Sequence, residues 1–247
     1  MKKIVVIVYW IALFYSVGWL GVTRAEQLEP PSRFIDYVVD PSQKQLAFYW
    51  RDEDKQPYRS FQNLKAALQK QQKTLLFAMN GGIFQEDFKP LGLYIEDGVV
   101  QYRLSTRQHG FGNFYIQPNG VFYLTEAGEG FIVPTSQFHH DASIQYATQS
   151  GPMLVIDGDI NPKLRQGSFN LRIRNGVGVL PNGQLLFAIS KTFVNFYDFA
   201  DYFKQQGCLN ALYLDGTVSQ VYIAENKRHI PGGFVGIIIA DVVQEPD

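Results

Sequence analysis

Four Asn-Gly or Asp-Gly pairs, each placed between two apolar segments, constrain the fold of this chain most strongly. They lie in the segments 95–100, 116–122, 155–160 and 179–185. Both central residues of a type I′ turn need a positive φ angle, which Asn, Asp and Gly tolerate. The pattern therefore predicts a strand-rich chain with several β-hairpins.

Two amphipathic segments predict helices. Ser60 is placed to cap a helix over residues 61–70, and a second helix that includes Phe196 and Phe203 should end at Gly207. Each helix leads directly into an apolar strand. We therefore predict an α+β fold with a mixed, largely antiparallel sheet, hairpins and a few packed helices.

The N-terminus has the pattern of a signal peptide. Lys2 and Lys3 precede an apolar run over residues 4–21, and small residues over 23–25 favour cleavage before Glu26. We predict a leader over residues 1–25, an exported, periplasmic or secreted protein, and a single domain over 26–247. The run approaches the length of a membrane span, so an uncleaved anchor is the alternative. After cleavage, no later segment predicts stable insertion into a membrane.

Charge and cysteine content exclude several classes of protein. The formal net charge is -1, and no run of Lys and Arg indicates a nucleic-acid surface. Cys208 is the only cysteine, which rules out an internal disulfide, a cysteine zinc cluster and a CxxC redox pair. We expect Cys208 to be a small buried residue.

Three apolar strands end at a polar residue next to glycine. These ends are Asn80-Gly81-Gly82, Ser150-Gly151 and Asp215-Gly216. Each pair by itself is common turn chemistry, but strand ends also gather ligand-binding groups. Three such ends in one chain favour a common site.

An arginine-containing segment adds a candidate anion-binding group. Arg172 and Arg174 fall on the same face of an extended segment, just before Gly176 and Gly178. A guanidinium binds a phosphate or carboxylate through two parallel hydrogen bonds. The alternative is a solvated edge strand with exposed charges.

Together, these motifs resemble the phosphodiester glycosidase domain family over about residues 70–241. The matching segments are Asn80-Gly81-Gly82-Ile83-Phe84, Ser150-Gly151-Pro152, Arg174 to Val179, and Gly207-Cys208 through Asp215-Gly216. Their order and spacing carry the resemblance. It implies hydrolysis of the glycosidic C–O bond of a sugar-1-phosphodiester, which leaves a phosphate monoester.

The chain departs from the family pattern at two places. It has Gly216-Thr217-Val218-Ser219 where the family often has Gly-Gly-Gly-Ser, and Arg172 where the family often has a histidine. Both departures bear on the substrate and the activity and leave the predicted fold unchanged.

The resemblance and the residue chemistry assign roles to these positions. Asp215 is the expected catalytic carboxylate, because an oxocarbenium-like centre is stabilised by negative charge. Arg174 is expected to assist departure of the phosphate electrostatically. The expected substrate-binding residues are Asn80, Gly81, Gly82, Ser150, Gly151, Gly216, Thr217 and Ser219. We predict no metal ligands and no cofactor, with a divalent metal left open.

Two alternatives remain from the sequence. One is a catalytically silent, periplasmic glycan-binding module that uses the same cleft, and the other is a metal-dependent phosphodiesterase that cuts P–O. The expected partner is a sugar phosphodiester or a cell-envelope glycan. The sequence does not define the sugar, the aglycone, the stereochemistry or the oligomeric state.

Overall fold

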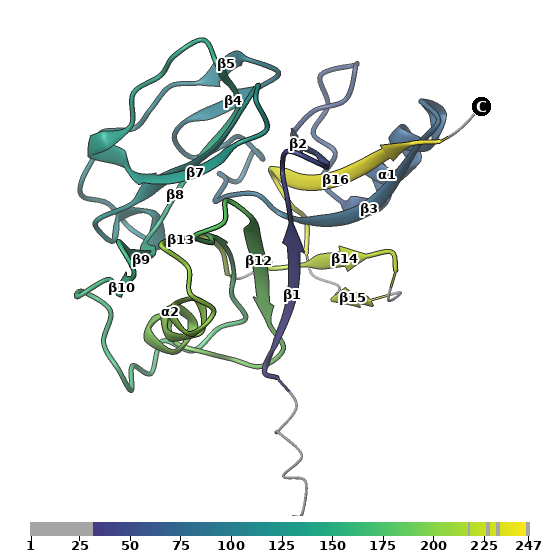
Figure 1. Cartoon of the computed structure of the whole chain (residues 1–247). Coiled ribbons are helices and arrows are strands. Elements are labelled where there is room, and N and C mark those ends of the chain that lie inside the picture. The colour runs from purple at the N-terminus through teal and green to yellow at the C-terminus, as the bar shows by residue number, and fades with distance from the viewer. Residues whose placement is uncertain (1–31, 217, 226–227, 231–232, 246–247) are drawn as a thin grey trace, which may run out of the picture. The chain divides into compact units, whose positions relative to one another are not determined.

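The computed structural model describes residues 32–216, 218–225, 228–230 and 233–245. These residues form three sheets and two α-helices, shown in Figure 1. Every strand pairing among them is antiparallel. The predicted leader over residues 1–25 and the candidate residue Thr217 lie outside this part of the chain.

The first sheet has six strands in the order β1-β12-β11-β13-β9-β10. Their bounds are β1 Phe34–Val39, β9 Met153–Ile156, β10 Asp159–Ile160, β11 Asn175–Val179, β12 Leu185–Ser190 and β13 Asn210–Asp215. The central strands β11 and β13 run in opposite directions, with Asn175 opposite Asp215. This register puts the start of β11 beside the end of β13.

The second and third sheets have five strands each, in the orders β15-β14-β3-β16-β2 and β5-β4-β8-β6-β7. The second contains β2 Gln45–Tyr49, β3 Lys73–Asn80, β14 Val221–Ile223, β15 Arg228–Ile230 and β16 Ile238–Gln244. The third contains β4 Tyr94–Glu96, β5 Val99–Tyr102, β6 Gly120–Thr125, β7 Gly130–Pro134 and β8 Ile144–Ser150. Two short 3-10 helices, η1 Asn113–Tyr115 and η2 Thr135–Gln137, flank β6 and β7.

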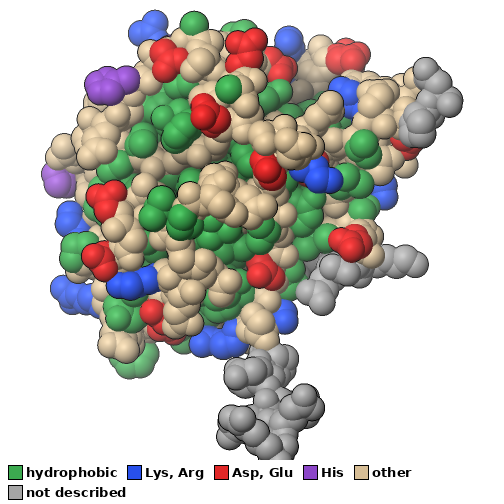
Figure 2. All heavy atoms as spheres, in the orientation of Figure 1, with side chains coloured by type: hydrophobic (Ala, Val, Ile, Leu, Met, Phe, Trp, Pro, Cys, Tyr) green, Lys and Arg blue, Asp and Glu red, His purple; other side chains and the backbone are tan. Residues whose placement is uncertain are grey.

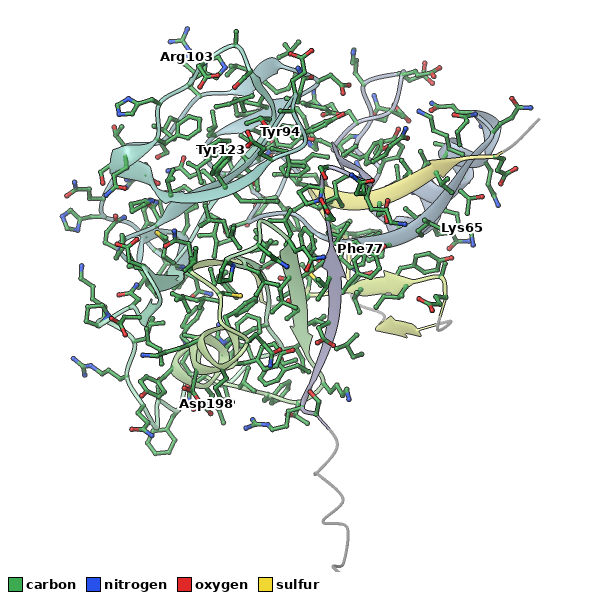
Figure 3. The ribbon with its side chains drawn as sticks, in the orientation of Figure 1. Lys65, Phe77, Tyr94, Arg103, Tyr123 and Asp198 are labelled. Atoms are coloured by element: carbon green, nitrogen blue, oxygen red, sulfur yellow. The ribbon has the colours of Figure 1, made fainter. Side chains whose placement is uncertain are left out.

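The main hydrophobic core lies between the three sheets. It combines Phe187 and Leu212 from the first sheet, Phe77 from the second, and Phe122 from the third. All four side chains are fully buried, and Figure 3 shows Phe77 in the interior. Burying a side chain of this size contributes about 1.5–3 kcal/mol, so this shared core holds the sheets together.

The two helices each cover the outer face of a sheet. Helix α1, Phe61–Lys70, buries Leu64 and Leu68 against the second sheet, and Ser60 Oγ accepts a hydrogen bond from Asn63 N–H as the predicted cap. Helix α2, Phe196–Gln205, packs Phe199 and Phe203 on the first sheet. Both helices and the strands that follow them are confirmed, and α2 is followed by Gly207 with φ 82°.

The broad prediction of an α+β fold is confirmed, with strands far outweighing helices. The expectation of a mixed sheet is wrong for the described strands, because none of them pairs in parallel. Three of the four predicted turns connect hairpins. They join β4 to β5, β9 to β10, and β11 to β12.

The predicted hairpin turn at Asn119-Gly120 is wrong. The preceding residues form η1 and a loop, so no strand is present to pair back. Asn119 is buried, its side chain donates to Phe114 O, and its backbone oxygen accepts from Thr135 N–H. Gly120 then begins β6, which pairs with both β7 and β8.

Cys208 is buried and free, as expected. Burial raises the pKa of its thiol to about 12, so the thiolate is scarce at neutral pH. No helix in the described ranges is both long and apolar enough to cross a membrane. On the face shown in Figure 2, acidic and basic side chains are interspersed.

Candidate functional site

The three sheets meet at a buried polar cluster. Asn80 ends β3 of the second sheet, Ser150 ends β8 of the third, and Asp215 ends β13 of the first. Asn175 begins β11, next to Asp215. The three strand ends that the sequence singled out therefore come together in space.

Asp215 is the only carboxylate in this cluster among the described residues, and its side chain is 8% exposed. Its Oδ1 accepts the backbone N–H of Gly216 at 2.6 Å. Its Oδ2 accepts Nδ2 of Asn80 at 3.1 Å. These two donors fix the plane of the carboxyl group.

Burial raises the pKa of Asp215 to about 7, because the charged carboxylate loses contact with water. The hydrogen bonds from Gly216 and Asn80 act in the opposite direction and limit the rise. No cation forms a salt bridge to Asp215 within the described ranges. Both protonation states are therefore accessible near neutral pH.

Asn80 and Asn175 hold Asp215 and the turn that follows it. Asn80 also donates to Val218 O at 3.1 Å and accepts the backbone N–H of Gln220 at 2.7 Å. Asn175 donates to Asn80 O at 2.9 Å and accepts the backbone N–H of Asp215 at 2.8 Å. The two amides thus tie β3, β11 and β13 into one frame.

Two serine hydroxyls complete this frame. Ser219 Oγ donates to Asp215 O at 2.8 Å, and Ser150 Oγ donates to Leu214 O at 3.0 Å. Both serines are buried. The Ser150 hydroxyl thus donates to the backbone of β13, and the Ser219 hydroxyl lies within hydrogen-bond distance of that backbone and, at 3.3 Å, of Asn175 Oδ1.

The site glycines are explained by close packing within the protein. A Cβ at Gly81 would lie 2.7 Å from Ile237 Cγ2, and one at Gly82 would lie 2.6 Å from Thr148 Oγ1. At Gly151 a Cβ would lie 2.6 Å from the Cβ of Asn119. The closest approach is at Gly216, where a Cβ would overlap the hydroxyl of Tyr213.

Arg174 directly precedes Asn175 in the chain and is fully buried. Its Nε donates to Val194 O at 2.9 Å, and its Nη2 donates to Asn170 O at 2.7 Å. Its guanidinium carbon lies 3.6 Å from the centre of the Phe196 ring. Nη1 is buried without a hydrogen-bond partner among the described residues. The Nε–Nη2 edge, one of the two edges that could fork around a phosphate, is thus occupied by backbone oxygens.

Arg172 differs from Arg174 in its surroundings. Its side chain is exposed, and Nη1 donates to the neighbouring Leu171 O at 2.7 Å. Its backbone forms an isolated bridge with Val194. The sequence assigned the catalytic role to Arg174, and the structure buries this side chain against Phe196 and Tyr213 while Arg172 is exposed.

Sequence reasoning missed two residues that shape this site. Asn175 lies within the segment Arg174 to Val179, but from the sequence a role was assigned only to the arginine. An amide at the start of an apolar strand is a signal that could have identified it. Tyr213 belongs to the apolar strand that ends at Asp215 and has the sequence context of a core residue. Its hydroxyl nevertheless accepts a hydrogen bond from Asn113 Nδ2 at 3.2 Å and lies against Gly216. Burial raises the pKa of Tyr213 well above its ordinary value, so it stays neutral.

Within the described ranges, no group of three or more His, Cys, Asp or Glu side chains is arranged to hold a metal ion. The oxygen and nitrogen atoms around Asp215 come from amides, hydroxyls and backbone groups. The arrangement offers one buried carboxyl group, a rigid frame that aims it, and a buried guanidinium whose carbon lies 5.5 Å from the centre of the Tyr213 ring.

Comparison with known proteins identifies sequence and structural similarity over most of the chain. A model of the phosphodiester glycosidase family matches residues 73–235. An uncharacterized protein of Escherichia coli (strain K12), YigE, is 41% identical over 190 residues, which are 76% of this chain and 73% of that protein. Residues 73–235, matched by the family model, contain every candidate site residue named above.

Two solved structures share the fold. One is the catalytic domain of zebrafish N-acetylglucosamine-1-phosphodiester alpha-N-acetylglucosaminidase, auto-inhibited by its pro-peptide. It has a TM-score of 0.57 and 15% identity, covering 87% of this chain and 85% of that chain. The other is a hypothetical protein from Synechocystis, with a TM-score of 0.53 and 13% identity, covering 85% of this chain and 59% of that chain.

Proposed function

Because this chain belongs to the phosphodiester glycosidase family, a hydrolase family, we propose that it hydrolyses the glycosidic C–O bond of a sugar-1-phosphodiester. The observation that carries the proposal is the convergence of the three family-like strand ends on Asp215. Water supplies a hydroxyl group to the sugar, and its remaining proton balances the released phosphate monoester.

We propose that the Asp215 carboxylate stabilises the positive charge that develops at the anomeric carbon. As the C–O bond breaks, positive charge develops on the sugar, and a carboxylate held in a buried site stabilises that charge more than one in water. Among the described residues, each oxygen of Asp215 receives one hydrogen bond, and we assign the remaining lone pairs to the substrate. The frame around it costs no reorganisation during the reaction.

We assign electrostatic and positioning roles to the surrounding residues. The charge of Arg174 favours the developing negative charge of the departing phosphate. Asn80, Ser150 and Ser219 direct their hydrogen bonds to the protein, so we assign them to orienting Asp215 and its turn. We infer that the substrate contacts Thr217 and the backbone around four glycines: Gly81, Gly82, Gly151 and Gly216.

We also propose that the protein acts after export, on a sugar phosphodiester or glycan of the cell envelope, and without a cofactor. The support is the leader-like pattern of residues 1–25. Intact-mass analysis of protein from the cell envelope tests export, with a mature chain that begins at Glu26 as the expected result. Recovery of only the full-length chain in the membrane fraction would support an anchor instead.

The reaction is tested by screening sugar-1-phosphodiesters with purified protein and analysing the products formed in oxygen-18 water. We expect the label on the sugar hydroxyl, as C–O cleavage requires. Label in the phosphate would overturn the glycosidase proposal in favour of a phosphodiesterase. Binding without any turnover would support the silent glycan-binding module.

The pH dependence of the reaction follows from the raised pKa of Asp215. Because the ionised form is the one assigned to catalysis, kcat/KM should fall about tenfold for each pH unit below about 7. In the unfolded chain this carboxyl ionises near 3.8, so the folded state binds the proton more tightly between about pH 4 and 7. The contribution of Asp215 to the free energy of unfolding therefore decreases as pH rises through that range.

A pH series of kcat/KM and of urea unfolding checks both statements. The Asp215→Asn variant provides the control, since it should lose the acidic limb of the activity profile. A profile whose acidic limb persists in that variant would assign the limb to another group.

Arg174→Lys should destabilise the fold and reduce turnover together. A lysine cannot donate to Val194 O and Asn170 O with the same geometry, so at least one buried carbonyl loses its partner. We expect the free energy of unfolding to drop by about 2 kcal/mol, and turnover of phosphodiesters to drop about tenfold.

Arg172→Lys is the matched control, because that side chain is exposed and only two residues away. It should leave both the unfolding midpoint and kcat/KM near the wild-type values. If Arg174→Lys were as mild as Arg172→Lys, Arg174 would have neither of its assigned roles.

A further inference from the structure

Three loops that contact Arg174 or Tyr213 each carry an exposed phenylalanine. They are loop 107–113 with Phe111, which runs into the first residue of η1, loop 161–174 with Phe169, and loop 191–195 with Phe193. These three residues are 101%, 96% and 65% exposed. A phenylalanine ring has no polar atom that hydrogen-bonds with water, so exposing three such rings to water is unfavourable in free energy. We refer to the three segments as the aromatic loops.

The aromatic loops rest on one buried cluster. Arg174 donates to Asn170 O in one loop and to Val194 O in another. The third loop is joined through Asn113, which donates to the hydroxyl of Tyr213. The rings of Tyr213 and Phe196 contact each other edge-on at 4.8 Å, and Arg174 covers Phe196. The bases of the loops are therefore neighbours, although they are far apart in the sequence.

The charge of the aromatic loops has one sign. They contain six basic residues and no Asp or Glu, although acidic residues outnumber basic ones in the whole chain, 23 to 22. Five of the six are exposed: Arg107, Lys163, Arg165, Arg172 and Lys191. Neither salt bridge among the described residues involves them. The acids nearest in sequence are Asp159, which pairs with Lys204, and Asp198 in the first turn of α2 (Figure 3).

We propose that the aromatic loops dock this domain on the surface of an anionic lipid bilayer, with Phe111, Phe169 and Phe193 entering the interface. Apolar rings beside basic side chains match the two layers of such a surface, acyl chains below and anionic headgroups above. A glycan would instead favour flat aromatic platforms with hydrogen-bonding groups, and exposed Phe offers none. The hydroxyl of Tyr213 lies against Gly216, so docking holds the candidate site near the lipid.

Vesicle binding tests the proposal with the full chain. We expect sedimentation with vesicles of phosphatidylglycerol and phosphatidylcholine, and weak sedimentation with phosphatidylcholine alone. Each basic residue at an anionic surface changes the partition coefficient about fivefold, so Lys163→Gln and Arg165→Gln should each weaken binding by about that factor. The triple variant Phe111→Ser, Phe169→Ser, Phe193→Ser should lose about tenfold or more.

Leu209→Ser is the matched control. Leu209 is 46% exposed and precedes Asn210 at the start of β13, whereas Asp215 ends that strand. It should bind vesicles as the wild type does. All variants retain residues 1–31, so any difference between them reports on the substituted side chains.

A second measurement locates the loops directly. The variants Phe111→Trp and Phe169→Trp should show a blue shift of the added emission on anionic vesicles and quenching by brominated acyl chains. Equal vesicle binding by the wild type and the triple Ser variant, or absence of quenching at both positions, would overturn the proposal. Binding of the aromatic loops to a soluble glycan with no affinity for vesicles would do the same.

Discussion

Asp215→Asn is expected to reduce turnover of a sugar phosphodiester about hundredfold or more, as loss of a principal catalytic group does. The substitution keeps the shape of the side chain and removes the negative charge that we assign to the anomeric carbon. Single-turnover and steady-state rates measured at pH 8 give the comparison, because the wild-type carboxyl is mostly ionised above its pKa of about 7.

The same variant has a cost in stability that the sequence does not reveal. Gly216 N–H donates to one oxygen of Asp215 and Asn80 Nδ2 donates to the other. In either orientation, the new amide NH2 faces a donor. Asn80 is unable to relieve this by turning its amide, since its oxygen accepts from Gln220 N–H. We expect the free energy of unfolding to fall by about 1–3 kcal/mol.

Asp157→Asn is the matched control for this experiment. Asp157 also follows an apolar strand and precedes a glycine, but it is exposed in the turn between β9 and β10. Asparagine tolerates its positive φ of 50° at least as well as aspartate does, so stability and turnover should be unchanged. Wild-type turnover by Asp215→Asn would refute the assignment of Asp215, even if the reaction class were correct.

Asp157 and Asp215 have similar local sequences but different surroundings in the fold. Both are Asp-Gly steps after apolar strands, and local chemistry predicts a turn at each. Only the resemblance to a family distinguished Asp215 as a candidate site residue from Asp157 as a turn residue. Pairing between strands that are distant in sequence explains this difference. Asp215 is buried because the start of β11 lies beside the end of β13, and β3 of another sheet brings Asn80 to it.

Features of the fold that depend on nearby residues were predictable from the sequence. Ser60 caps α1, and Phe199 and Phe203 lie on the buried face of α2, because caps and helical periodicity depend on nearby residues. The error at Asn119-Gly120 is the converse. A turn-like dipeptide there begins a strand, since β6 pairs with β7 in a hairpin that starts after it and with the more distant β8.

The roles of Asn175 and Tyr213 depend entirely on such long-range placement. An asparagine that bridges Asn80 O and Asp215 N–H looks in the sequence like any polar residue at a strand start. A tyrosine between leucines looks like core. Only the folded arrangement shows that the hydroxyl of Tyr213 occupies the space that a side chain at position 216 would need.

Gly216→Ala should therefore be among the most damaging single changes at this site, and Tyr213→Phe should rescue it. The new Cβ overlaps the Tyr213 hydroxyl, and Tyr213 has little freedom to move because it is 1% exposed and packs on Phe196. The strain should displace the turn that carries Asp215. A shift of about 1 Å in a catalytic group costs about hundredfold in rate, and overpacking costs about 1–3 kcal/mol of stability.

Tyr213→Phe removes the oxygen and leaves the ring carbon Cζ as the nearest atom, 3.3 Å from the Cβ position. That distance needs only a small adjustment, so the double variant should regain at least about tenfold in turnover over Gly216→Ala alone. Tyr213→Phe by itself should cost about 1 kcal/mol of stability, because Asn113 loses its acceptor, and should change turnover little. If the double variant were no better than Gly216→Ala, the glycine would be required by something other than the tyrosine. The proposed contact between the substrate and the backbone of Gly216 would then be the better explanation. A bound substrate would meet the new methyl group in both variants.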